Sequence, residues 1–279
     1  METLFKVLFG SKKKLLAIII LIAAVQLLTS SYYVNLFGWN LYSVERVFQK
    51  GNKTITLLGT VHIADKEYYD EISNRYKNSL FLLEMVEKDV EMDVPMTYKG
   101  LSEYVDLSAQ EMHFDPNRDG NKFIVADKKM SELNNLSIKT LKDVFTYIDL
   151  IPKGELSKMD LEDISFIDKM KNMKRDIIDG RSVRLMEHIY EFEGQENLVV
   201  PWGALHLPYV QDKIKELGYI KVKESRLKAF NVVKYLYTFL TKYYGGGNIL
   251  LIILAFVSIS WLISNRQKIF RNKKDLNLA

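Results

Sequence analysis

Two of the four histidines occur in the same local pattern, a Gly-x-x-His motif. His62 closes Gly59-Thr60-Val61-His62, and His206 closes Gly203-Ala204-Leu205-His206. Each motif follows a β-rich apolar run, and its glycine allows a sharp turn and a close approach to a ligand. With Glu84, which ends another apolar run, these imidazoles match the ligand set of many catalytic divalent-metal sites. His62, His206 and Glu84 are therefore candidate metal ligands; the alternative is that the histidines are structural.

The residues around the first motif predict a hairpin, a helix and a buried strand. Residues 41–48 and 54–58 are β-rich runs on either side of a Gly-containing loop. Asp65 is the expected N-cap of a helix that ends near Lys77. Residues 80–83 are apolar without alternation, which is typical of a strand covered on both faces in a parallel sheet.

The second motif is preceded and followed by the same kinds of elements as the first motif, in the same order. A short strand, 198–200, precedes it, a helix of about 209–217 follows and ends at Gly218, and a strand is expected at 219–222. Two strand–Gly-x-x-His–helix units predict an α/β fold, a mixed sheet with flanking helices. Ligand sites in such sheets lie outside the carboxyl ends of the strands, so one edge is expected to carry both histidines and Glu84.

Two apolar segments, residues 15–36 and 248–264, lie on either side of this middle part. Each is about long enough to cross the ~30 Å hydrocarbon core of a membrane. Basic residues outside both segments predict two transmembrane helices with both termini cytoplasmic and the middle extracytoplasmic. A cleaved signal peptide is the alternative for the first segment, and a buried core helix is the alternative for the second.

These patterns divide the chain into six expected parts. They are a cytoplasmic basic tail (1–14), a transmembrane anchor (15–36), an α/β domain (38–228), an aromatic and Gly-rich linker (229–247), a transmembrane helix (248–264) and a second cytoplasmic basic tail (265–279).

The net charge of +4 is unevenly distributed. The two tails hold nine of the 39 basic residues but two of the 35 acidic ones, so the rest of the chain is nearly neutral. The basic character therefore indicates a membrane-lipid partner and gives no support to nucleic-acid binding. The chain has no cysteine, which excludes disulfides, thiolate metal sites and a cysteine nucleophile.

The two motifs, together with Leu82-Leu83-Glu84-Met85, resemble the TraB/PrgY/GumN family, which includes the TIKI proteases and belongs with the erythromycin-esterase/ChaN-like superfamily. The resemblance covers about residues 41–224. Residues 180–186 resemble the family's Arg-Asn helix, with Ser182 in place of asparagine. Arg181 aligns best as the functional arginine, and Arg184 is the alternative.

The resemblance implies a site that combines the two histidines, Glu84 and an arginine, with a divalent metal as cofactor. The leading hypothesis is a membrane-anchored, metal-dependent, peptidase-like hydrolase that acts on peptides. In it Arg181 and Glu84 are catalytic, and Arg181 stabilises negative charge on the scissile carbonyl oxygen. The alternative is a non-catalytic protein that sequesters a peptide or another ligand, as pheromone-shutdown proteins do. Haem binding, as in ChaN-like relatives, is a third possibility.

Other polar residues are given structural roles. His113 and His188 lack the glycine context and are expected not to bind metal. Residues 115–120 resemble the start of an EF-hand loop but lack its final glutamate, so a polar turn is expected. Asp127 is expected to cap a helix at 128–133, with a supporting role at the site as the alternative.

Overall fold

The computed structural model describes residues 34–37, 39–91, 93–155, 173–194 and 197–244. The chain divides into two units after Val232. The predicted membrane segments lie outside the described residues, except that 34–36 form part of a strand. Among the described residues, none of the helices combines the length and the apolar character that a membrane span requires.

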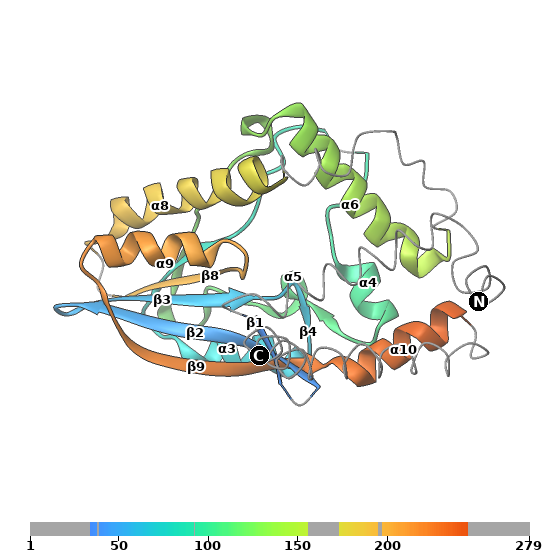
Figure 1. The fold of residues 1–279 in the computed structure, drawn as a ribbon, viewed down its shortest axis with the longest axis horizontal. Helices are drawn as coiled ribbons and strands as arrows, with labels where there is room; N and C mark the ends of the chain where they lie inside the picture. Colours follow the sequence, from blue (N-terminus) through green and yellow to red (C-terminus); the bar gives the residue numbers. More distant parts are fainter. Residues whose placement is uncertain (1–33, 38, 92, 156–172, 195–196, 245–279) are drawn as a thin grey trace, which may run out of the picture. The chain divides into compact units, whose positions relative to one another are not determined.

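The first unit is built on a seven-stranded mixed sheet (Figure 1). β3, β8, β5 and β7 are parallel and adjacent in that order, and β2 runs antiparallel to β3. β1 and β9 each pair antiparallel with β2. The predicted α/β class with a mixed sheet and flanking helices is therefore confirmed. The strands of this sheet are β1 (Val34–Phe37), β2 (Asn40–Lys50), β3 (Lys53–Thr60), β5 (Leu80–Leu83), β7 (Lys122–Val125), β8 (Asn197–Gly203) and β9 (Ile220–Asn231).

Helices cover both faces of the sheet. Neighbouring residues of a strand point to opposite faces. Glu45 of β2 contacts Arg75 at the end of α3, whereas Arg46 contacts Gln211 in α9. Consequently α3 covers one face, and α9, beside α8, covers the other (Figure 1). The helices and smaller elements are α3 (Lys66–Arg75), α4 (Lys99–Tyr104), α5 (Gln110–His113), α6 (Asn135–Lys153), α8 (Arg181–Phe192), α9 (Leu207–Glu216), short 3₁₀ helices (Arg118–Gly120 and Met130–Glu132), a π-helix (Met173–Gly180), and a small ladder of β4 (Ile63–Ala64) with β6 (Ser108–Ala109).

The parallel strands β3, β5 and β8 are buried on both faces, as the absence of alternation at residues 80–83 predicted for β5, whereas β7 is partly exposed. Successive side chains are buried along β3, β5 and β8. Because helices cover both faces, apolar side chains on either side of these strands contribute to the core. The largest fully buried side chains include those of Trp202, Phe81, Tyr68, Tyr69 and Phe48.

The β2–β3 hairpin and helix α9 follow the predicted positions closely. The hairpin turns at Gly51 and Asn52, and Gly51 has a φ of 62°, a left-handed conformation that favours glycine. Gly218 follows α9 with a φ of 87°, as expected for a residue just after a helix end.

Strand β9 is longer than predicted. The expected strand was 219–222 with Glu224 after its end, but β9 runs to Asn231 and Glu224 lies inside it. Its first half is largely exposed, and lysines alternate there with Ile220 and Val222. The apolar pattern in the sequence is therefore shorter than the strand. The pairing of β9 with β2 continues beyond it, because backbone hydrogen bonds need no apolar side chains.

The described part of the second unit belongs to helix α10 (Val232–Tyr244). Of the residues expected in a linker at 229–247, 229–231 form the end of β9 and 232–244 are helical. Tyr235, Phe239 and Tyr243 recur every four residues, which is a helical spacing.

Candidate functional site

The sheet order brings the predicted site residues to one edge. β8 lies between β3 and β5, and all three strands are parallel, so their carboxyl ends are neighbours. Glu84 directly follows β5, Gly203 is the last residue of β8, and His62 comes two residues after β3. His206 occupies the N-cap position of α9, where the chain leaves the same edge.

The Glu84 carboxylate is almost fully buried and is held at both oxygens. Its side chain is 8% exposed. Oε1 accepts a hydrogen bond from Nη2 of Arg181 at 2.8 Å, and Oε2 accepts one from the backbone N–H of Gly203 at 2.5 Å. A Cβ atom on Gly203 would lie 3.1 Å from Oε2. A glycine at position 203 therefore lets the carboxylate approach the end of β8.

Arg181 is the first residue of α8 and is buried between two carboxylates. Its Nε donates to Oδ1 of Asp127 at 2.8 Å, and its Nη2 donates to Oδ2 of Asp127 at 2.5 Å as well as to Glu84. The guanidinium carbon lies 5.6 Å from the centre of the Trp202 ring. Arg184 instead lies at the surface and pairs with Glu187. Of the two arginines, Arg181 therefore contacts the site.

His206 has a defined tautomer. The hydroxyl of Ser182 donates to the Ile178 carbonyl oxygen at 2.6 Å, which uses its single proton. Nδ1 of His206 lies 3.0 Å from that hydroxyl oxygen and 3.1 Å from the same carbonyl oxygen, so Nδ1 carries a proton and donates. Nε2 then faces Oε1 of Glu84 at 3.5 Å.

The charges of the site set the protonation states of these groups. Burial alone would raise the pKa of Glu84, but electrostatic interactions with Arg181 and with the His206 and His62 imidazoles, together with the Gly203 N–H, lower it to about 2. Burial lowers the pKa of His206, and the nearby Arg181 charge lowers it further, against the opposite effect of Glu84. At neutral pH the carboxylate is therefore ionised and the imidazole is neutral.

The neutral His206 and the ionised Glu84 present two acceptors to each other. With Nδ1 protonated, Nε2 has a lone pair, and the carboxylate oxygen 3.5 Å away has only lone pairs to offer. Such a pair is unfavourable unless a cation or a proton lies between its members. Imidazole nitrogen and carboxylate oxygen both bind divalent metals, and a metal-binding histidine usually donates its other ring N–H to an oxygen, as His206 does.

His62 lies at the same edge, but its ring packs against another residue. The imidazole is stacked on Tyr98, with ring centres 4.8 Å apart and planes 4° from parallel. Its carbonyl oxygen accepts a hydrogen bond from the backbone N–H of Gln110 at 3.0 Å. Over the described part of the chain, no group of three His, Asp or Glu residues is arranged to hold a metal ion. The structure thus brings Glu84, His206 and Arg181 into contact and leaves His62 beside Tyr98.

The prediction of Asp127 as a helix cap is wrong. The N-cap of the 3₁₀ helix after it is Lys129. The Asp127 side chain is fully buried and binds Arg181 through both oxygens, although Oδ1 also accepts from the N–H of Lys128. Two charge-assisted bonds to a guanidinium outweigh a single backbone contact. The strand-end rule that selected Glu84 also selects Asp127, which follows β7 at the same edge.

The remaining polar candidates lie apart from this site. Nδ1 of His188 is 3.5 Å from Glu191 on the same helix, and its ring stacks on Phe192. His113 is the last residue of α5, and its ring does not contact Glu84 in the described part of the chain. Residues 115–120 form a turn that includes a short 3₁₀ helix, as expected for this polar segment.

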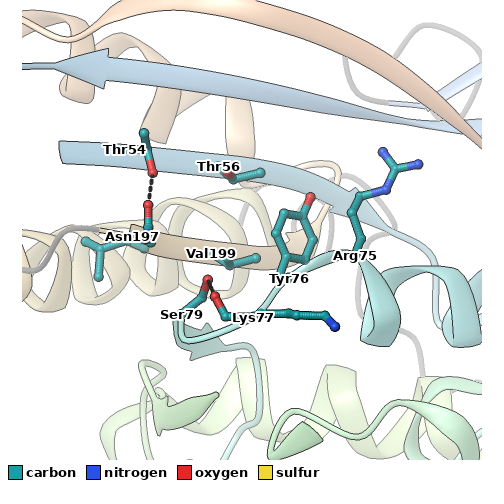
Figure 2. Close-up of a pocket in the computed structure, with 9 residues that line it drawn as sticks. Thr54, Thr56, Arg75, Tyr76, Lys77, Ser79, Asn197 and Val199 are labelled. Atoms are coloured by element: carbon teal, nitrogen blue, oxygen red, sulfur yellow. Dashed lines mark hydrogen bonds between the residues drawn. The ribbon is translucent and has the colours of Figure 1, made fainter. Parts of the chain in front are cut away.

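A separate polar pocket lies at the opposite, amino-terminal ends of β3 and β8 (Figure 2). Its volume is about 220 Å³, and Thr54 binds Asn197 on its wall through a 2.8 Å hydrogen bond. Because it lies at the other edge of the sheet, this pocket contains none of the residues around Glu84. It is lined by Thr54, Thr56, Arg75, Tyr76, Lys77, Ser79, Asn197, Leu198 and Val199.

Comparisons of the chain with protein-family models, with curated proteins and with solved structures found no match.

Proposed function

We propose that the protein is a membrane-anchored, metal-dependent hydrolase that acts on peptides outside the cytoplasmic membrane. One observation carries the metal part of the proposal: Nε2 of the neutral His206 faces an ionised oxygen of Glu84 at 3.5 Å. A divalent cation satisfies both acceptors at once. The hydrolase part and the peptide substrate rest on the resemblance of both Gly-x-x-His motifs to the TraB/PrgY/GumN family.

In this proposal His206 and Glu84 hold the metal, and His62 supplies the third ligand from the end of β3. The metal, when bound, polarises a substrate carbonyl and lowers the pKa of water. Glu84, with a pKa of about 2, is a poor general base at neutral pH and a good anionic ligand. Its position is held by Arg181 and by the N–H of Gly203.

Arg181 is proposed to have two roles, which are separable by experiment. It fixes Glu84 through the 2.8 Å hydrogen bond, and it carries the positive charge that favours a developing oxyanion on the substrate. Because Asp127 binds the guanidinium at two atoms, the arginine is oriented before any substrate arrives.

Metal content of the purified full-length protein in detergent tests the proposal. Wild-type protein is expected to hold close to one divalent ion per chain, and His206→Ala and Glu84→Gln are expected to lose most of it. His188→Ala is the matched control, since this histidine also pairs with a glutamate but lies away from the site. Equal metal content in all four proteins, or none in the wild type, would exclude the metal site.

The alternative function is non-catalytic sequestration of a peptide or other ligand at the same edge. It is favoured by the fact that Arg181 and the Gly203 N–H already neutralise Glu84 within the protein. This alternative predicts that metal-free wild-type protein binds a peptide without cleaving it. Haem binding, the third possibility, predicts a Soret absorption band in the purified protein.

A further inference from the structure

The polar pocket at the amino-terminal ends of β3 and β8 contains a buried hydroxyl group for which the described residues offer no partner. Thr56 of β3 lines this pocket and is 5% exposed (Figure 2). It is paired with Val47 of β2 and Val199 of β8, so apolar side chains lie on both sides of it. Within the described part of the chain, the Thr56 hydroxyl makes no hydrogen bond. A buried hydroxyl without a partner is costly, so a molecule in the pocket is expected to bind it.

One wall of the pocket, the loop after α3, is fixed by the side chain of Asn121. Its Oδ1 accepts a hydrogen bond from the N–H of Ser79 at 2.9 Å, and its Nδ2 donates to the Tyr76 carbonyl oxygen at 2.9 Å. The N–H of Lys122 also donates to the Ser79 carbonyl oxygen at 3.0 Å. The wall is therefore formed before a ligand arrives, and binding costs little ordering of the loop.

The charged side chains that line the pocket are basic. Arg75 and Lys77 belong to the lining, and over the described residues no carboxylate does. Glu45 and Glu71 pair with the two Nη atoms of Arg75, and the Nε–H takes no part in these pairs. The Lys77 ammonium lies 3.8 Å from Asp119, and its side chain is 67% exposed. This surface pair is weak, and the flexible lysine chain has the freedom to turn toward an anion.

The uncharged groups and the size of the pocket also suit an oxyanion. The Thr54 hydroxyl donates to Oδ1 of Asn197 at 2.8 Å, so Asn197 uses its acceptor within the wall and keeps its two N–H donors. Figure 2 shows this pair at one end of the pocket and Arg75 with Tyr76 at the other. The volume of about 220 Å³ equals that of roughly seven water molecules. A phosphate or carboxylate group with a small substituent fits this space.

We propose that this pocket binds a small oxyanion, a phosphate or a carboxylate group, through Thr56, Asn197 and Lys77. The pocket lies at the edge of the sheet opposite to Glu84, so the site goes beyond the proposed function and does not depend on it. The Thr56 hydroxyl is the group that distinguishes a ligand site from a polar surface, because it is buried and has no other role in the described structure.

Calorimetric titration of the full-length protein in a non-ionic detergent, with inorganic phosphate and separately with acetate, tests the proposal. Thr56→Val keeps nearly the same shape and removes the hydroxyl, and it is expected to weaken binding about tenfold. Thr60→Val is the matched control. Thr60 is 4% exposed on the same strand, its hydroxyl also lacks a partner among the described residues, and it does not line the pocket. Tighter binding of phosphate than of acetate identifies a phosphate-bearing ligand, and the reverse order identifies a carboxylate.

Two charge variants locate the bound anion. Lys77→Gln is expected to weaken binding roughly threefold, since the lysine is largely exposed. Lys66→Gln is its control, because Lys66 is exposed on the same side of the chain, in α3, and does not line the pocket. Glu84→Gln is expected to bind phosphate as the wild type does. Loss of phosphate binding in Glu84→Gln would place the anion at the other edge of the sheet and overturn the proposal.

Chemical denaturation separates loss of the hydroxyl from loss of structure. Valine at position 56 lies between two valines, so the unfolding midpoint of Thr56→Val is expected to stay the same or to rise. Thr56→Ser keeps the hydroxyl and is expected to bind as the wild type does. Equally weakened binding in Thr56→Ser and Thr56→Val would assign the loss to packing and contradict the proposal. It is also contradicted if the wild type binds neither anion, or if the wild type and Thr56→Val bind with equal affinity.

Discussion

Gly203 connects the backbone of β8 to the Glu84 carboxylate through one hydrogen bond and one close approach. Its N–H donates to Oε2, and a methyl group in place of its hydrogen would lie 3.1 Å from that oxygen. The same residue opens the second Gly-x-x-His motif. The glycine of the motif is therefore needed for the position of the carboxylate as well as for the path of the chain.

We expect Gly203→Ala to displace Glu84 by a few tenths of an ångström and to weaken metal binding. The carboxylate has little freedom to move away, since Arg181 holds its other oxygen. Calorimetry with Zn²⁺ on the full-length protein measures the effect. Gly100→Ala is the control, because a Cβ there meets nothing within 4 Å and alanine favours a helix. Equal affinities of the two variants would contradict the role assigned to Gly203.

Arg181→Lys is expected to weaken metal binding and to lower stability by about 1–3 kcal/mol. Lysine offers one ammonium group in place of a planar fork, so it leaves Asp127 or Glu84 with an unmet acceptor in a buried place. Arg184→Lys is expected to change neither property, because Arg184 pairs with Glu187 at the surface. Chemical denaturation and metal titration of both variants give the comparison. If Arg181→Lys changed neither metal binding nor stability, the role assigned to Arg181 would be contradicted.

Strand ends were the part of the site that the sequence could predict. Glu84 and His206 were placed at one edge because parallel strands share the direction of their carboxyl ends, and the structure brings them to 3.5 Å. The supporting role of Asp127 at the site was only the alternative, because a residue before a predicted helix also suits an N-cap, and its contact with Arg181 could not be foreseen. Tyr98 gave no local signal, because its contact with His62 depends on how distant segments pack.

At the scale of elements, a second buried ionic cluster joins β2, α3 and β9. Glu45 of β2 is 1% exposed. Its carboxylate binds Arg75 at 2.9 Å, the hydroxyl of Ser225 at 2.8 Å, and the hydroxyl of Tyr76. Burial alone would raise the pKa of Glu45, but these bonds together lower it below its ordinary value of 4.5. Three elements are therefore joined by one ionised group.

The free energy of unfolding is expected to fall in acid as Glu45 takes up a proton. A carboxyl group with a lowered folded-state pKa stabilises the protein above its unfolded-state pKa, and the contribution is lost as the pH falls through the folded-state pKa. Glu45→Gln is expected to lose about 1–3 kcal/mol at pH 7 and to show a flatter pH dependence below pH 4.5. Glu187→Gln, at an exposed pair, is the control for urea titrations at several pH values. Identical pH profiles for the wild type and Glu45→Gln would contradict the assignment.

Among the elements, the buried strands were predicted well and the exposed ones poorly. β5 coincides with the predicted run 80–83, because an unbroken apolar sequence is favoured where both faces of a strand are buried. β9 was predicted at 219–222 and extends to Asn231, since a charged edge strand shows no apolar pattern. The aromatic residues before the second apolar segment were expected in a linker, although their spacing suits the helix that they form.

At the scale of the whole molecule, the proposed topology places both termini in the cytoplasm and the α/β domain outside. It rests on the basic residues beyond the two apolar segments, which lie outside the described residues. A reporter fused after Ala279 is expected to be cytoplasmic, and protease added to intact cells is expected to cleave the middle of the chain. A protected middle or an external C-terminus would refute the topology. A mature N-terminus near Ser30 would identify the first segment as a cleaved signal peptide.

The insertion of β8 between β3 and β5 makes the order of synthesis matter. β3 and β5 are complete by residue 83, yet neither pairs with the other in the finished sheet. Both must wait for a strand that emerges more than 110 residues later, at Asn197–Gly203. Until then β3 can pair with β2 and β5 with β7, but each of the two strands lacks its neighbour on the other side, which favours slow folding and association with other chains. The same strand delivers the Gly203 N–H to Glu84, so the carboxylate acquires its native setting only after β8 has been synthesised.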